Sequence, residues 1–157
     1  MRVGFGYDVH AFTEDRPLIL GGIEIPHSRG LLGHSDADVF LHAVCDALLG
    51  AIADGDIGSH FPDTDPQYHG IRSTLLLKKV VTRVREKRFH VVNIDGTIAC
   101  QRPKLADFIP RMKGEIAGVV ELETGRINIK ATTTEGLGFT GREEGIAAYA
   151  VVLVEED

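Results

Sequence analysis

The chain has 157 residues, of which 43% are hydrophobic and 25% charged, and its formal net charge is -6. This length supports a single domain over residues 1–157 with a substantial core, and the composition is typical of soluble globular proteins. The negative charge argues against a nucleic-acid partner, and no apolar run approaches the ~20 residues of a membrane span.

The first part of the chain predicts a strand and then a hairpin. In residues 1–9 apolar side chains alternate with small or polar ones, which is the pattern of a strand. Asp8 and His10 are two positions apart, so we expect both to project from one face at the end of this strand. Residues 18–20 and 23–25 flank a Gly-Gly pair and predict a tight hairpin.

A long helix is predicted to begin at Ser35 and to end before an Asp-Gly pair. Ser35 is the candidate N-cap, and Asp38 follows as a carboxylate variant of the capping box. At ~100° per residue, Asp38, His42 and Asp46 fall on one stripe of the helix. Five apolar residues fall on the opposite face: Phe40, Val44, Ala47, Leu48 and Ala51. His34 precedes the helix start, where backbone N–H groups favour anions.

The rest of the chain predicts two helices and three strands around two loops. Residues 54–70 are rich in Gly, Pro and Asp, and a loop of this length is often functional, although a solvated surface loop is the alternative. A glycine-rich loop follows at residues 136–145. The predicted elements are a helix over residues 73–87 capped by Ser73, a strand over 89–100, a helix over 105–118, and strands over 126–134 and 146–154.

This order of elements predicts an α+β fold in which a single mixed sheet is covered by helices on one face. We expect the last two strands to pair antiparallel through the glycine-rich loop. In the strand that begins at residue 89, Val92, Ile94 and Ile98 are expected to point into the core.

Asp8, His10 and His42 form a candidate metal site. One carboxylate and two imidazoles leave a fourth tetrahedral position open, which is typical of a catalytic zinc ion. Asp46, one helical turn after His42, is expected to orient that imidazole. The alternative is that His42 is a surface or core histidine, because separation along the chain does not establish that the two segments meet.

Two further clusters have weaker signals. Thr132 and Thr133 offer hydroxyls to phosphate oxygens, and Glu135 can hold a hard cation such as Mg²⁺. The alternative is that threonines are simply favoured in strands. The segment 100–106 joins a strand to a helix, and its backbone could contact a base edge with Lys104 near a phosphate, although an ordinary loop is the simpler interpretation.

The chain contains two isolated cysteines, Cys45 and Cys100, without C-x-x-C spacing. We expect both to be reduced and buried, as in a cytoplasmic protein, and a disulfide between them is the alternative. The first residues do not form a signal peptide, because no long apolar segment follows them.

Seven motifs follow one another along almost the whole chain. They are D-V-H at 8–10, G-H-S-D-A-D-V at 33–39, D-A-L-L-G-A at 46–51, G-D-I-G at 55–58, F-P-D-T-D at 61–65, K-A-T-T-T-E at 130–135 and L-G-F-T-G-R at 137–142. In this order and spacing they resemble the 2-C-methyl-D-erythritol 2,4-cyclodiphosphate synthase family of the non-mevalonate isoprenoid pathway. The chain departs from the family pattern at Arg102, Gly136 and Glu143.

The resemblance implies a homotrimer whose active sites lie between adjacent subunits. It implies Zn²⁺ on Asp8, His10 and His42, and a second divalent cation, Mg²⁺ or Mn²⁺, near Glu135. The implied substrate is a cytidine diphosphate compound. In several members an apolar channel on the three-fold axis can also hold an isoprenoid diphosphate.

The resemblance also implies roles for individual residues. His34 and Thr133 would stabilise the transition state. The positions implied to contact the substrate or to line the axial channel are Ser35, Asp56, Gly58, Asp63, Cys100, Lys104, Leu105, Ala106, Thr132, Phe139 and Arg142.

The implied reaction is that of a phosphorus–oxygen lyase. It converts 4-diphosphocytidyl-2-C-methyl-D-erythritol 2-phosphate to the 2,4-cyclodiphosphate with release of CMP, by attack of the 2-phosphate on the β-phosphorus. The chain contains no convincing nucleophilic triad, which is consistent with a substrate that supplies its own nucleophile. The alternatives are a zinc-dependent phosphodiesterase, a non-catalytic trimer that binds a nucleotide or an isoprenoid diphosphate, and a protein with a purely structural zinc.

Overall fold

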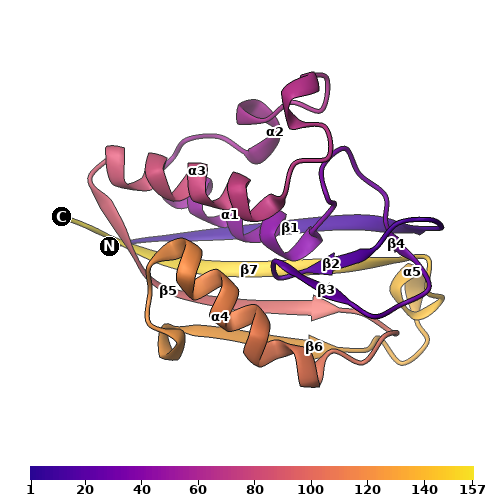
Figure 1. Cartoon of the computed structure of the whole chain (residues 1–157). Coiled ribbons are helices and arrows are strands. Elements are labelled where there is room, and N and C mark those ends of the chain that lie inside the picture. Colours follow the sequence, from indigo (N-terminus) through magenta and orange to yellow (C-terminus); the bar gives the residue numbers. More distant parts are fainter.

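A five-stranded mixed sheet in the order β4-β1-β7-β5-β6 organises the computed structural model, which describes all of residues 1–157. β1 (Arg2–Thr13) and β5 (Phe89–Ala99) both pair antiparallel with β7 (Gly145–Glu156). β6 (Ile127–Thr132) runs parallel to β5, and the short β4 (Gly30–Leu31) extends the edge beside β1. Both chain ends lie at one end of the sheet (Figure 1).

Three long helices pack on one face of this sheet (Figure 1). They are α1 (Val39–Ala51), α3 (Ser73–Glu86) and α4 (Ile109–Val120). The predicted mixed α+β architecture, with its helices on one face, is therefore confirmed. None of the helices has both the length and the apolar character needed to cross a membrane. Cys45 and Cys100 are buried free thiols, as expected.

Two glycines allow α1 to lie directly on β1. A Cβ atom on Gly4 would lie 1.8 Å from the Ala47 carbonyl oxygen, and one on Gly6 would lie 1.9 Å from that of Ala43. The even-numbered residues of β1 therefore face the helix, because side chains alternate along a strand. The odd-numbered Phe5 and its neighbours face the other side of the sheet and are exposed.

The smaller elements refine the prediction. The hairpin predicted at residues 18–25 is present as β2 (Leu18–Leu20) and β3 (Ile23–Ile25), but it forms a second, two-stranded sheet, so the prediction of a single sheet was incomplete. The loop predicted over residues 54–70 contains α2 (Ile57–His60) and a 3-10 turn. The remaining short elements are α5 (Gly138–Gly141) and the 3-10 turns Pro66–Tyr68, Ala106–Phe108 and Thr124–Arg126.

The prediction that the last two strands pair with each other is wrong. β5 lies between β6 and β7, so that β6 is an edge strand and β7 is bonded on both sides. The nearly continuous apolar sequence of β7 accounts for this position, since a central strand buries most of its residues. Val92 also differs from the prediction: it is skipped at a bulge in β5 and is half-buried, whereas Ile94 and Ile98 are fully buried.

The main helix begins later than predicted. Its N-cap is Asp38, whose carboxylate accepts from the Leu41 N–H at 3.0 Å, so the prediction of Ser35 as N-cap is wrong. The same carboxylate accepts from the N–H groups of Gly21 and Gly22 in the turn between β2 and β3. Asp38 is fully buried and does not belong to an exposed polar stripe. Burial raises the pKa of its carboxyl to about 6, although the backbone hydrogen bonds oppose this shift.

We expect Asp38→Ala to lower the free energy of unfolding by about 3 kcal/mol or more. The substitution leaves three N–H groups without their acceptor, and each such loss costs about 1–3 kcal/mol when the group stays buried. Urea denaturation measures the change. Asp38→Asn retains one acceptor oxygen and should lose less, whereas Asp107→Ala, at an exposed position, is the control. Equal stability of Asp38→Ala and the wild type would contradict the assigned anchor.

The other long helices also differ at their starts. α3 begins at Ser73, but the residue at its N-cap position is Arg72, and no side chain caps the helix. The prediction of Ser73 as the cap is therefore wrong, because its hydroxyl donates to Asp36 instead. In α4, Pro110 occupies the first turn, where its missing N–H leaves no helical hydrogen bond unmade.

Candidate functional site

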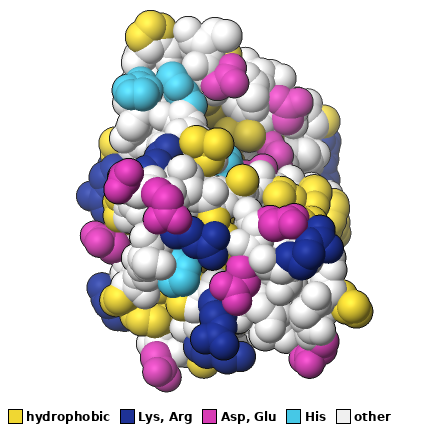
Figure 2. Space-filling model, turned by 90° about the vertical axis from the view of Figure 1, so that its right-hand side faces the viewer, with side chains coloured by type: hydrophobic (Ala, Val, Ile, Leu, Met, Phe, Trp, Pro, Cys, Tyr) yellow, Lys and Arg dark blue, Asp and Glu magenta, His cyan; other side chains and the backbone are white.

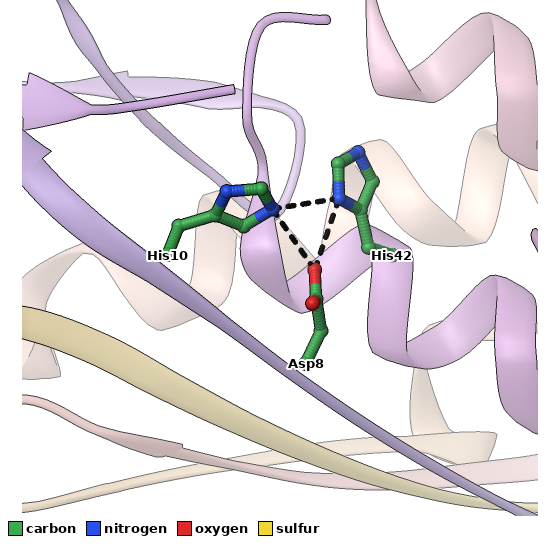
Figure 3. Close-up of side chains that lie close together, drawn as sticks. All are labelled: Asp8, His10 and His42. Carbon is green, nitrogen blue, oxygen red and sulfur yellow. Dashed lines mark hydrogen bonds and ion pairs between the residues drawn. The ribbon is translucent and has the colours of Figure 1, made fainter. Parts of the chain in front are cut away.

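The three predicted metal ligands meet where β1 passes beside α1. Asp8 Oδ2 lies 3.0 Å from His10 Nε2 and 3.0 Å from His42 Nδ1, and the two nitrogens are 3.1 Å apart (Figure 3). Asp8 and His10 share the face of β1 that Gly4 and Gly6 bring against the helix. The close approach of β1 and α1 thus brings together residues that are up to 34 positions apart. The predicted juxtaposition is confirmed, and these residues could hold a metal ion.

The donor atoms of this cluster fit a cation. His10 Nδ1 lies 2.6 Å from the Leu32 carbonyl oxygen, which can only accept, so this nitrogen carries a proton and Nε2 keeps its lone pair in the neutral ring. Burial raises the pKa of the Asp8 carboxyl, but its close contacts with the imidazoles of His10 and His42 outweigh this effect and hold the pKa well below its usual range. Burial lowers the pKa of His10, and its contacts with Asp8 more than reverse this, so that it is raised. The cluster therefore favours positive charge, which a divalent cation can supply.

A cavity of about 260 Å³ opens beside the candidate metal ligands. Four further predicted site residues line it with His10 and His42: His34, Ser35, Gly58 and Asp63. His34 lies with its Nε2 3.2 Å from the Asp65 carbonyl oxygen, to which it can donate. Asp56 does not line the cavity; it caps α2, where its carboxylate accepts from the Ser59 N–H at 2.7 Å.

The cavity also has an apolar wall, none of whose residues was predicted from the sequence as a site residue. It consists of Ile57, Phe61, Tyr68, Ile71 and Leu76. These residues come from the segment that includes α2 and from the first turn of α3, and the tertiary structure alone brings them together. Two of them lie in sequence motifs: Ile57 in G-D-I-G and Phe61 in F-P-D-T-D.

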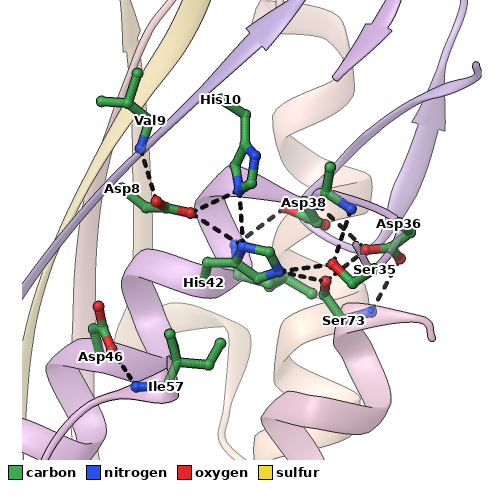
Figure 4. A network of polar contacts seen from close by, with 12 residues as sticks. Asp8, Val9, His10, Ser35, Asp36, Asp38, His42, Asp46, Ile57 and Ser73 are labelled. Atoms are coloured by element: carbon green, nitrogen blue, oxygen red, sulfur yellow. Dashed lines mark hydrogen bonds and ion pairs between the residues drawn. The ribbon is translucent and has the colours of Figure 1, made fainter. Parts of the chain in front are cut away.

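Asp46 does not orient His42 as predicted. Its carboxylate accepts from the Ile57 N–H at 2.7 Å and so fixes the start of α2 against α1. The outer nitrogen of His42, Nε2, instead faces the hydroxyls of Ser35 at 3.1 Å and Ser73 at 3.0 Å (Figure 4). The sequence stripe placed Asp46 near His42 correctly but could not reveal the competing backbone donor.

A second, smaller cavity of about 130 Å³ lies between the end of β6 and the segment after β5. Six predicted residues line it, together with Pro103 and Ala131: Cys100, Lys104, Leu105, Ala106, Thr132 and Thr133. Burial raises the pKa of Cys100 to about 12, and its thiol donates to the Arg102 carbonyl oxygen at 2.9 Å. This thiol is therefore protonated near neutral pH and is not an activated nucleophile.

Within one chain the predicted site is divided into two parts. The two cavities share no lining residue: His10, His34 and His42 line the first, and Thr133 lines the second. The Thr133 hydroxyl donates to Glu135 Oε1 at 3.0 Å, which places Glu135 beside the second cavity.

The predicted channel residues line neither cavity. Phe139 lies in α5, and Arg142 follows it and pairs with Glu144 at 2.9 Å. Figure 2 views the end of the molecule that lies at the right in Figure 1, where α5 is found. Acidic and basic side chains are interspersed over this end, with histidines among them.

The three departures from the family pattern have local structural partners. Gly136 has a φ of +77°, a conformation that favours glycine. Arg102 Nε lies 3.5 Å from a Glu143 carboxylate oxygen, and Arg29 lies 3.7 Å from the other. The two charged departures thus form an ion pair with each other at the surface.

Comparison with known proteins gives matches over the whole chain. The 2-C-methyl-D-erythritol 2,4-cyclodiphosphate synthase of Syntrophobacter fumaroxidans is 64% identical over 157 residues, which are 100% of this chain and 99% of that protein. The corresponding synthase of Syntrophomonas wolfei is 59% identical and covers 99% of both chains.

Solved structures agree with this similarity. The bifunctional IspDF from Campylobacter jejuni superposes with a TM-score of 0.96 at 47% identity; the match covers 99% of this chain and 42% of that longer chain. A CDP-bound 2C-methyl-D-erythritol-2,4-cyclodiphosphate synthase superposes with a TM-score of 0.90 at 37% identity, covering 98% of this chain and 100% of the other. The model of the YgbB family matches residues 1–155. The chain therefore belongs to the YgbB family, in which its curated relatives are 2-C-methyl-D-erythritol 2,4-cyclodiphosphate synthases.

Proposed function

We propose that this chain is a single-domain enzyme that converts 4-diphosphocytidyl-2-C-methyl-D-erythritol 2-phosphate to 2-C-methyl-D-erythritol 2,4-cyclodiphosphate and CMP, a phosphorus–oxygen lyase reaction. The observation that carries this proposal is the convergence of Asp8, His10 and His42 beside a cavity that His34 also lines. Full-length similarity to synthases of this name supports it, and a CDP-bound relative supports a cytidine diphosphate substrate.

Asp8, His10 and His42 would hold Zn²⁺, and Glu135 would hold Mg²⁺ or Mn²⁺. When bound, these cations supply Lewis-acid stabilisation of charge on phosphate oxygens. The position of His10 and His42 supports the zinc site, because both residues line the cavity and a metal ion on them would be accessible to a substrate. Glu135 is exposed beside the second cavity, where its carboxylate remains accessible.

The chain itself has to position the substrate more than it has to react with it. An oxygen of the 2-phosphate forms a bond to the β-phosphorus, and the bond from that phosphorus to CMP breaks, with the electron pair leaving on CMP. No protein nucleophile takes part, which agrees with the protonated state of Cys100. Holding the tethered phosphate near its attack geometry could lower the activation free energy by roughly 7–11 kcal/mol.

The two cavities would divide the substrate between them. His34, Ser35, Gly58 and Asp63 line the first and would contact the erythritol and phosphate part, with Asp56 at its edge. The residues that line the second would hold cytidine and its phosphate: Cys100, Lys104, Leu105, Ala106, Thr132 and Thr133. His34 and Thr133 would then stabilise the transition state from opposite sides.

A homotrimer with sites between subunits would bring the two cavities together. The sheet face opposite the helices supports it, because Val3 is 67%, Phe5 62% and Tyr7 47% exposed. On the paired strand Tyr149 and Val151 are also exposed, and the Tyr7 and Tyr149 rings lie 5.0 Å apart. Contiguous apolar surface of this kind marks an interaction site. In such a trimer Phe139 and Arg142 would line an axial channel that could take an isoprenoid diphosphate.

We expect Phe5→Asp to shift the protein from trimer to monomer. The substitution places a charge at the centre of the exposed apolar face, where burial against another subunit would be costly, yet it leaves the helix-covered core untouched. Size-exclusion chromatography with light scattering measures the mass. Glu24→Asp, at an exposed position of β3, is the control. A trimeric Phe5→Asp protein would contradict this interface.

Incubation of the purified protein with the cytidine diphosphate substrate, Zn²⁺ and Mg²⁺ tests the reaction. We expect CMP release together with a product that has the mass of the cyclic diphosphate. Reaction in ¹⁸O-labelled water separates this from the phosphodiesterase alternative. A linear product that contains solvent oxygen would overturn cyclisation, and the absence of CMP release would overturn the proposed activity.

A further inference from the structure

A series of hydrogen bonds runs from His42 away from the other metal ligands to the start of α3 (Figure 4). His42 Nε2 lies 3.0 Å from the Ser73 hydroxyl, and that hydroxyl lies 2.5 Å from Asp36 Oδ1. The second oxygen of Asp36 accepts from the backbone N–H of Ser73 at 3.0 Å. His42 lies in α1, Ser73 is the first residue of α3, and Asp36 lies in the segment before α1.

The carboxylate of Asp36 determines the direction of these bonds. Because a carboxylate only accepts, the Ser73 hydroxyl donates its single proton to Asp36 and can only accept from His42. His42 Nε2 therefore carries the ring proton. The other ring nitrogen, Nδ1, keeps its lone pair and directs it at the position shared with Asp8 and His10.

Ser35 makes a different contribution to the same nitrogen. Its oxygen lies 3.1 Å from His42 Nε2 and also accepts from the Ala37 N–H at 3.1 Å. Unlike Ser73, it has no carboxylate behind it, and it lines the first cavity. Its proton can thus be offered to a ligand in the cavity, which leaves Ser73 and Asp36 as the fixed support of the imidazole.

We infer that Asp36 and Ser73 are positioning residues of the metal centre, which act through His42. This inference rests on the metal site of the proposed function. Two features support it: Ser73 is fully buried beside the ring, and its bond to Asp36 is one of the shortest in the site. A carboxylate linked to a ligating histidine fixes the ring orientation and raises its basicity, and loss of such a partner typically weakens metal binding by ~10–100-fold.

The same two residues also tie the start of α3 to the segment before α1, so a change in stability alone would not establish the inference. Zinc affinity of the folded protein is therefore the primary measurement, by competition with a chromophoric chelator. We expect Ser73→Ala and Asp36→Asn each to weaken Zn²⁺ binding by ~10–100-fold. Thr82→Ala is the matched control, because it removes a hydroxyl from the same helix that bonds only to the Lys78 carbonyl oxygen.

Cobalt substitution provides a second readout that a purely structural role would not change. The visible absorption of bound Co²⁺ depends on ligand geometry, so it should shift in Ser73→Ala and remain unchanged in Thr82→Ala. The double variant of Ser73→Ala and Asp36→Asn should bind zinc no more weakly than the weaker single variant, because both changes interrupt one path. If Ser73→Ala does not fold, Asp36→Asn carries the same test.

Folded variants with wild-type zinc affinity and an unchanged cobalt spectrum would overturn this inference alone. A wild-type protein that binds neither Zn²⁺ nor Co²⁺ would overturn the proposed metal centre, and the inference with it. The two failures are thus distinguishable by the behaviour of the unmodified chain.

Discussion

His42→Ala is expected to abolish stoichiometric zinc binding and to reduce CMP release by about 10³-fold or more. The imidazole would contribute one of only three protein ligands, and its Nδ1 lies within 3.1 Å of the other two candidate ligand atoms. A metal ion acting as a Lewis acid supplies several kcal/mol of stabilisation, and each 1.36 kcal/mol corresponds to a factor of ten in rate. Metal content by mass spectrometry and the rate of CMP release measure the two effects.

His90→Ala is the matched control for this prediction. His90 is an exposed histidine of β5 that pairs with Asp157 at 2.7 Å, and it lines neither of the two site cavities. Its loss should leave metal content and turnover within about twofold of the wild type, since surface substitutions have small effects. Wild-type metal content in His42→Ala would contradict the assigned ligand set.

The same prediction separates a catalytic metal from a structural one. The hydrophobic core contains 36 buried residues, whereas the three candidate ligands are only partly buried. We therefore expect the protein to remain folded after a chelator removes the metal. Its unfolding transition should still be cooperative, while turnover is lost. A structural zinc site would instead unfold on chelation, as zinc fingers do.

The candidate metal site was predictable from the sequence because its parts have strong local signals. Asp8 and His10 are two apart on a strand, and His42 lies on a helix with a clear polar stripe. Their meeting, however, depends on Gly4 and Gly6, whose missing side chains allow α1 to lie against β1. The alternation of apolar and polar residues in residues 1–9 predicted the strand. It did not reveal that the apolar face of this strand is exposed.

The errors about polar side chains share one physical origin, which is competition between partners for the same polar group. Asp46 could serve His42 or the Ile57 N–H, and the backbone donor takes it. Asp38 could be an exposed charge or an anchor, and three N–H groups hold it in the core. Local periodicity predicts on which face of a helix such residues lie, but it does not predict which hydrogen-bond donor they contact in the folded chain.

Coassembly of two inactive variants is expected to restore about a quarter of the wild-type activity. His42→Ala damages the first cavity and Glu135→Gln removes a charge beside the second. If each site takes one cavity from each of two neighbouring subunits, every mixed trimer contains one intact site of three. Random mixing makes about three-quarters of the trimers mixed, so about a quarter of all sites recover.

The experiment requires the two variants to be unfolded together and refolded as a mixture, with CMP release measured per subunit. Combining them without unfolding should restore nothing if trimers do not exchange subunits. A mixture of His42→Ala and Asp8→Ala should also remain inactive, because both changes fall in the same cluster of ligands. Recovery with His42→Ala and Glu135→Gln, but not with this second pair, requires that functional residues come from different chains. No recovery despite verified mixed trimers would mean that one subunit supplies its whole site, and the division between the two cavities would then have another cause.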